Sequence, residues 1–132
     1  MIGRQLGNVP KEHNFRLKDG YEIKNLYELS INLAGMNDET FMHHVNGEKN
    51  DFMNWVLHVL KDEKLAKRLA KTKDRGKTAR IVEKRITELE KEKRHHEQVV
   101  EQGIKWGVKQ FGIGLVTGLF IGLVFLRALG KI

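Results

Sequence analysis

Cysteine is absent from this 132-residue sequence, and proline occurs only once. Without cysteine the chain has no disulfide, no thiolate metal site and no cysteine nucleophile, and it is compatible with a reducing cytosol. The first fifteen residues contain no continuous apolar run behind Arg4, unlike a secretory signal peptide. We therefore expect the N-terminal part of the chain to stay in the cytoplasm.

Charged side chains are missing from residues 111–126, although 31% of the whole sequence is Asp, Glu, Lys or Arg. A helix of this length rises about 24 Å, slightly less than the roughly 30 Å hydrocarbon layer of a bilayer. Lys109 and Arg127 flank the run and can lift their charges to the interface, while Trp106 suits the headgroup level. A chain this short and polar can hardly bury an all-round apolar helix in a core. The run therefore predicts a single transmembrane helix over residues 105–130.

Glycine recurs at helical spacing in and before this apolar run. Four-residue steps place small residues on one helix face, where two backbones can approach closely in lipid. Thr117 borders this face and can hydrogen-bond across it. Glycine is also common in membrane helices without such a role. The pattern favours a homo-oligomer, or packing on another membrane helix, through Gly107, Gly114, Thr117, Gly118 and Gly122.

Positive charge is concentrated in the middle of the sequence, in a chain of net charge +7. Between residues 64 and 85, ten Lys and Arg face only Asp74 and Glu83. A solvated helix face, attraction to anionic lipid or an acidic partner, and binding of nucleic acid all fit this composition. The stretch lacks interleaved aromatic residues, which disfavours RNA. The candidate anion-binding residues are Lys64, Lys67, Arg68, Lys71, Lys73, Arg75, Lys77, Arg80, Lys84 and Arg85.

The first half of the sequence predicts a small helical domain with a β-hairpin. Residues 15–23 alternate apolar and polar side chains around Asp19-Gly20, a strong hairpin signal. Helices are expected after Asn25, after Asn37 or Asp38, and after Asn50 or Asp51, because these residues cap helix N-termini. The first of these helices should turn Leu26, Leu29, Ile31, Leu33 and Met36 inward.

A break near residues 72–76 should start one helix that continues into the bilayer. Ala79, Val82, Ile86 and Leu89 follow heptad spacing, so this helix either forms a coiled coil or packs on its own domain. The predicted fold class is mainly α. Its parts are a flexible N-terminus over residues 1–13, a helical domain with the hairpin over residues 14–73, a charged stalk over residues 74–104, and the membrane helix.

The most distinctive motif covers residues 41–56 and reads FMHHVNGEKNDFMNWV. Over about residues 14–86 the sequence resembles a small uncharacterised helical domain of archaeal and bacterial proteins. The resemblance implies a compact helical module without an assigned activity, and it supplies no catalytic residues. The motif also contains the polar residues that we expect at a partner-binding rim, which are His43, His44, Asn46, Asn50 and Asp51.

Adjacent histidines diverge by about 100° on a helix, so His43 and His44 do not form a metal site by themselves. Helix capping and packing are the main interpretation of this cluster. We predict no cofactor, no metal and no catalytic residue. The sequence predicts a non-enzymatic, tail-anchored protein of the cell membrane whose cytoplasmic domain binds a protein partner. A membrane-tethered RNA- or ribosome-binding protein and a metal-dependent enzyme centred on His43 and His44 are the alternatives.

Overall fold

The computed structural model describes residues 2–130 and is mainly helical, with one small hairpin and a long C-terminal helix apolar enough to cross a membrane. This confirms the predicted fold class. The residues fall into two compact units, of which the first extends to Lys93 and the second begins at Arg94.

The hairpin pairs β1 (Phe15–Arg16) with β2 (Glu22–Ile23) in antiparallel register, with Phe15 opposite Ile23. Gly20 has a backbone φ of 88°, a conformation that residues other than glycine adopt only at an energetic cost. The turn therefore lies where Asp19-Gly20 predicts it. A hairpin this short is not stable alone. It is held by the Phe15 ring, which packs 4.9 Å from the Phe52 ring of α4 (Asp51–Trp55).

Asparagine side chains start the helices of the first unit, as the sequence predicts. Asn25 caps α2 (Leu26–Gly35), Asn37 caps α3 (Asp38–His44) and Asn50 caps α4, in each case by accepting a hydrogen bond from the backbone N–H three residues ahead. Leu26, Leu29 and Leu33 form the buried stripe of α2. The prediction that Ile31 points inward is wrong, because it lies on the opposite face and is 71% exposed.

After Trp55 the chain widens into a π-helix, η2 (Val56–Leu60), which no sequence pattern indicates. Lys61 ends it in the left-handed conformation, with φ of 58°. The next helix, α5 (Glu63–Leu69), starts at Asp62, whose carboxylate accepts a hydrogen bond from the Leu65 N–H. This turn brings the buried Asp62 side chain to the inner face of the last helix.

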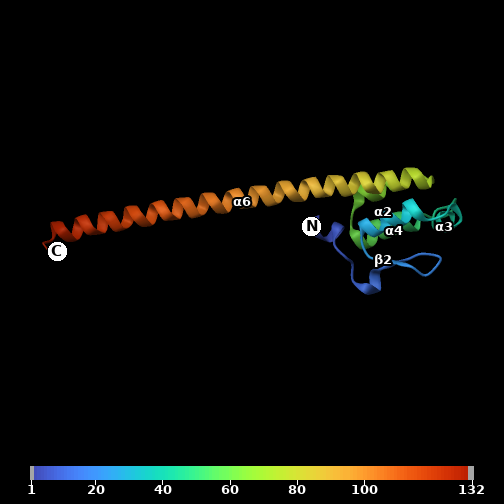
Figure 1. The fold of residues 1–132 in the computed structure, drawn as a ribbon, viewed down its shortest axis with the longest axis horizontal. Coiled ribbons are helices and arrows are strands. Elements are labelled where there is room, and N and C mark those ends of the chain that lie inside the picture. The colour runs from blue at the N-terminus through green and yellow to red at the C-terminus, as the bar shows by residue number, and fades with distance from the viewer. Residues whose placement is uncertain (1, 131–132) are drawn as a thin grey trace. The chain divides into compact units, whose positions relative to one another are not determined.

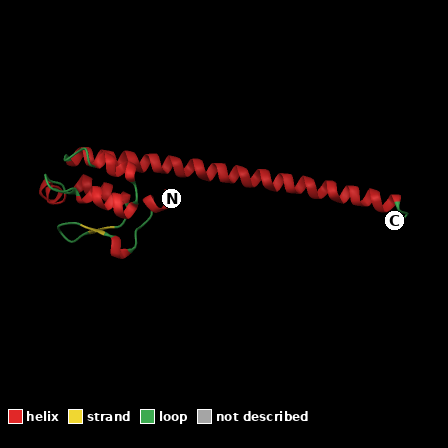
Figure 2. Ribbon diagram, turned by 180° about the vertical axis from the view of Figure 1, so that it is seen from behind, coloured by secondary structure: helices red, strands yellow, loops and turns green. Residues whose placement is uncertain are grey.

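The last helix, α6 (Arg75–Ala128), begins after Asp74, which accepts a hydrogen bond from the Lys77 N–H. Its Val82, Ile86 and Leu89 are buried in the core of the first unit, so this part of the heptad pattern packs on the chain's own domain. In Figure 1 the hairpin and the start of α6 lie on opposite sides of α2 and α4, and Figure 2 shows the same layers from behind.

The structure differs from the predicted division of the chain in two places. The domain does not end at residue 73, because α6 contributes core residues up to Leu89 and the compact unit continues to Lys93. The predicted flexible N-terminus also differs from the structure over residues 2–13. There, α1 (Ile2–Leu6) and η1 (Lys11–His13) form, and the Trp55 indole N–H donates to the His13 carbonyl at 2.8 Å.

A buried ion pair joins α6 to the turn before α5. Arg85 Nε donates to Asp62 Oδ2 at 2.8 Å, and the two side chains are only 7% and 1% exposed. Removing one partner of such a pair leaves an uncompensated charge in the interior.

We expect Asp62→Ala to lower the free energy of unfolding by about 3–5 kcal/mol, since it removes both the buried partner of Arg85 and the cap of α5. Asp74→Ala is the matched control, because it removes an exposed aspartate cap and should cost about 1 kcal/mol. Urea unfolding in neutral detergent, followed by Trp55 fluorescence in a Trp106→Phe background, measures both. Equal losses for the two variants would contradict the role of the ion pair.

Candidate functional site

His44 lies at the junction of α3, α4 and the hairpin, and it is 5% exposed. The Lys18 backbone N–H donates to its Nε2 at 3.1 Å, and its Nδ1 lies 3.0 Å from Asp51 Oδ2. Because a backbone N–H can only donate, Nε2 is the acceptor, and Nδ1 carries the proton that is donated to Asp51. Both ring nitrogens of His44 are therefore occupied within the fold.

Burial lowers the pKa of His44 below its ordinary value of 6.5, although the hydrogen bond and charge of Asp51 oppose this shift. Burial raises the pKa of Asp51, but the hydrogen bonds from Lys49 and His44 outweigh it and hold that pKa below its usual range. The cluster is thus a neutral histidine beside an ionised aspartate. Its hydrogen bonds link the hairpin, through His44 of α3, to Asp51 of α4.

The predicted partner-binding rim is mostly engaged inside the domain. Asn50 caps α4 and donates from Nδ2 to the Leu69 carbonyl at 3.2 Å. Asn46 accepts hydrogen bonds from the Glu48 and Lys49 N–H groups in the turn after α3. Of the five predicted residues, His43 is the one that is exposed.

Among the described residues, the histidines do not gather with other metal-binding side chains. Across residues 2–130, no three His, Asp or Glu side chains come together in a way that can hold a metal ion. In His44, the two ring nitrogens that would bind a metal already make hydrogen bonds to Lys18 and Asp51. The arrangement offers hydrogen bonds that join α3 to α4 and to the hairpin.

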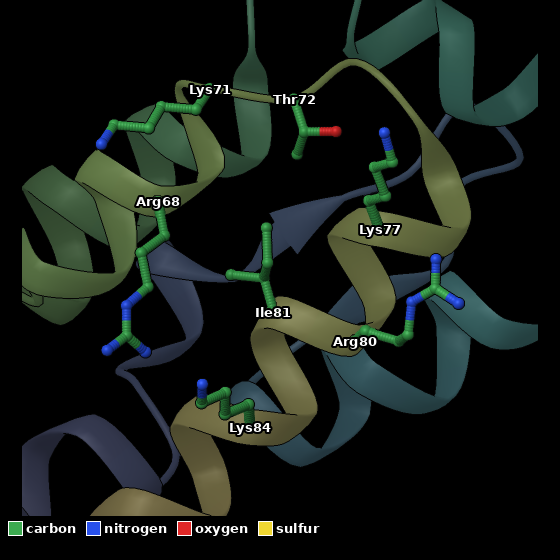
Figure 3. Close-up of a pocket in the computed structure, with 7 residues that line it drawn as sticks. All are labelled: Arg68, Lys71, Thr72, Lys77, Arg80, Ile81 and Lys84. Atoms are coloured by element: carbon green, nitrogen blue, oxygen red, sulfur yellow. The ribbon is translucent and has the colours of Figure 1, made fainter.

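A shallow groove lies between α5 and α6 in the first unit. We call it the cation groove. Figure 3 shows the Ile81 side chain between the two helices, with the nitrogen-bearing ends of Arg68, Lys77 and Lys84 around it. Five of the lining side chains carry a positive charge, and Ile81 is the apolar one. The cation groove is lined by Arg68, Lys71, Thr72, Lys77, Arg80, Ile81 and Lys84.

Four of the ten predicted anion-binding cations are paired within the chain. Lys64 and Arg68 contact Glu88 at 3.2 and 3.0 Å, and Arg75 contacts Asp38 at 2.8 Å. Hydrogen bonds, with that from Arg68 the largest cause, lower the pKa of Glu88 to about 2. Arg85 is a correction to the prediction, because it is buried against Asp62 and does not reach a surface.

The other six predicted cations are exposed. Within the described part of the chain, none of them has a carboxylate partner within salt-bridge distance. Four of them line the cation groove and two lie outside it. The groove members are Lys71, Lys77, Arg80 and Lys84, and the other two are Lys67 and Lys73.

In the second unit, the apolar part of α6 is uncovered by protein. Its most apolar 18-residue stretch has no buried residue, and Phe111 and Val116 are 75% and 68% exposed. Trp106, Lys109 and Arg127, the predicted interface residues, are exposed as well. A surface of this kind is compatible with a membrane anchor.

The glycine face of this helix is open. A Cβ atom built at Gly107, Gly114, Gly118 or Gly122 meets no other atom within 4 Å. The Thr117 hydroxyl donates to the Ile113 carbonyl at 2.9 Å, so its proton is used within the helix. Thr117 therefore offers a neighbouring helix only an acceptor.

Sequence analysis missed the floor of the cation groove and the partner of Arg85. Ile81 is an apolar residue within a basic stretch, and that contrast is the signal that marks the floor. Asp62 carries no comparable signal, because its sequence context is that of an ordinary helix cap.

Comparison with known proteins gives no match to a family model, a curated protein or a solved structure. The resemblance to the archaeal and bacterial domain therefore stays a prediction. The functional interpretation rests on the geometry of the chain itself.

Because the folded-state pKa of His44 lies below 6.5, the unfolded chain binds more protons as the pH falls through that value. The stability that neutral His44 contributes is complete above pH 6.5 and is lost as the pH falls through the folded pKa. We expect His44→Gln to cost about 1–3 kcal/mol at pH 7.5 and to weaken the dependence of stability on pH between 7.5 and 5. Urea unfolding at the two pH values measures this.

His58→Gln is the matched control, since His58 is exposed and is not among the groups that shift the pKa of His44, so it should leave that pH dependence in place. Asp51 titrates at lower pH, outside this window. An unchanged pH dependence in His44→Gln would contradict the assignment of a neutral His44.

Proposed function

We propose that this protein is a non-enzymatic, single-pass membrane protein that holds a binding domain at a bilayer. The observation that carries the proposal is the apolar stretch of α6, of which no residue is buried in the structure. A helix that is apolar all round needs either a protein core or lipid to cover it. The second unit has no core around this stretch, which supports lipid as the cover.

The flanking residues support this interpretation. Trp106 suits the headgroup region, and Lys109 and Arg127 can extend their charges to the two interfaces. Basic residues are numerous before the apolar stretch, which favours a cytoplasmic N-terminal side by the positive-inside rule. The domain up to Lys93 would then face the cytoplasm of the cell.

A role in binding fits the first unit better than catalysis. Buried His44 has a carboxylate partner in Asp51, and both of its ring nitrogens make hydrogen bonds that serve the fold. The cation groove instead presents positive charges without partners, which suits an anionic partner. Within this proposal the domain recognises its partner mainly through the groove, while most of the polar rim at residues 43–51 supports the fold.

Self-association through the membrane helix is part of the same proposal. Gly107, Gly114, Gly118 and Gly122 share one face, and the space beside each of them is open. In lipid, close packing over small residues is a main source of helix association. A second copy of this helix would fill that face.

We expect the full-length chain to stay in membranes after extraction with alkaline carbonate. Replacing Leu119 and Phe120 by Lys should move it to the supernatant, because each central lysine costs about 2.5–3.5 kcal/mol on insertion scales. The control is Gln98→Lys with Gln102→Lys, which adds the same charge to exposed positions outside the apolar stretch. Release of the unmodified chain by carbonate would refute the anchor.

For self-association, Gly118→Leu should weaken the oligomer by about tenfold or more, because the side chain separates the two backbones. Gly112→Leu is the matched control, since Gly112 is also open but lies about 120° around the helix from Gly118. Förster transfer between labelled copies in neutral lipid vesicles measures both. Equal transfer in the two variants would argue against the glycine face.

A further inference from the structure

We propose that the cation groove binds an acidic peptide segment of a protein partner, with an apolar side chain of that segment seated on Ile81. This inference rests on the proposed function and names the partner class of the same site. Carboxylates on either side of the apolar side chain would meet Lys77, Arg80 and Lys84.

The distribution of acidic residues around the groove is uneven, and this supports the proposal. The single carboxylate of Glu88 contacts three cations, which are Lys64, Arg68 and Arg85. The exposed groove residues Lys71, Lys77, Arg80 and Lys84 have no carboxylate within salt-bridge distance in the described chain. The first unit therefore pairs Arg68 of the groove with Glu88 and leaves the other four cations of the groove without a carboxylate partner among the described residues.

Lys77, Arg80 and Lys84 follow one another at steps of three and four residues, so they share one face of α6. Like charges at this spacing repel one another on a helix. An anionic ligand along this face removes the repulsion and forms charge-assisted hydrogen bonds. The domain alone offers no equivalent compensation.

The floor of the groove restricts the kind of anion. Ile81 is half-buried against the core between α5 and α6, and it is the apolar side chain among the seven lining residues. A ligand made only of charged groups would leave this apolar surface in contact with water. A ligand that places an apolar side chain there removes that surface from water and gains from its burial.

Nucleic acid and a bilayer surface fit the groove less well. None of the seven lining residues is aromatic, so bases have no ring to stack on. A flat layer of lipid headgroups supplies phosphates, but it does not place an apolar group on the recessed Ile81. A protein segment can supply both the charge and the apolar side chain.

The spacing of the cations sets the spacing expected in the ligand. Lys77 and Lys84 are seven residues apart, which is about 10 Å along a helix. An extended peptide covers the same distance in about three residues. We therefore expect acidic residues on both sides of one apolar residue, within a segment of about five.

The test uses the full-length chain in phosphatidylcholine nanodiscs and a displayed library of random 12-residue peptides. Peptides are selected on the unmodified protein after removal of those that bind Lys77→Glu with Lys84→Glu. We expect the enriched peptides to contain an apolar residue flanked by Asp or Glu. Their affinity should fall at least tenfold in the double variant and also in Ile81→Ser.

The matched control is Lys67→Glu with Lys73→Glu, which changes the net charge equally at two exposed cations outside the groove. Its affinity for the peptides should stay within about twofold. Circular dichroism of every variant checks that the helices are retained. Absence of enrichment, enriched peptides without an apolar residue, or equal losses in the two double variants would overturn the proposal.

Labelled poly(U) and vesicles containing phosphatidylserine are tested with the same variants. Groove-dependent binding of either one, without peptide binding, would overturn the proposal in favour of that anion. Carbonate extraction tests the membrane anchor independently of peptide selection. A chain that stays in the membrane but selects no peptide refutes this inference alone, and a released chain that still selects peptides refutes the anchor alone.

Discussion

The buried contact between Asp62 and Arg85 is the interaction on which the organisation of this protein depends. It joins the turn before α5 to α6, with Arg85 Nε 2.8 Å from Asp62 Oδ2. A charge this deep is tolerated only with a partner. The pair thereby selects one position of α6 against the domain, in which Val82, Ile86 and Leu89 enter the core. The same position leaves the opposite face of α6, with Lys77, Arg80 and Lys84, exposed beside α5.

The motif around His44 has a related structural role on the other side of the domain. A two-stranded hairpin has little stability of its own, and the His44 ring supplies a fixed acceptor for the Lys18 N–H near its turn. Asp51, at the first position of α4, holds that ring in the required tautomer. The buried member of the adjacent histidine pair, His44, therefore connects three elements by hydrogen bonds.

Much of the fold follows from local sequence signals. Asn25, Asn37 and Asn50 each begin a helix in the structure, and Asp19-Gly20 forms the hairpin turn. These features depend on interactions within a few residues. The partner of Arg85, the π-helix and the end of the domain depend on contacts between distant residues, which local patterns do not contain. The spacing of Val82, Ile86 and Leu89 fits a coiled coil as well as a core face, so it does not locate the end of the domain, which lies near Lys93 and not at residue 73. Likewise, ten basic residues predict a charged surface, but only the structure separates those already paired from those in the groove.

The assignment of the first part of α6 to the domain core has a consequence for proteolysis. Cleavage within residues 94–104, where every side chain is exposed, would release a domain that keeps all its core residues. Cleavage in the short link between α5 and α6 would instead separate Arg85 from Asp62 and remove three core side chains. A protease acting on the first segment would therefore release an intact folded domain, whereas one acting on the second would disrupt it.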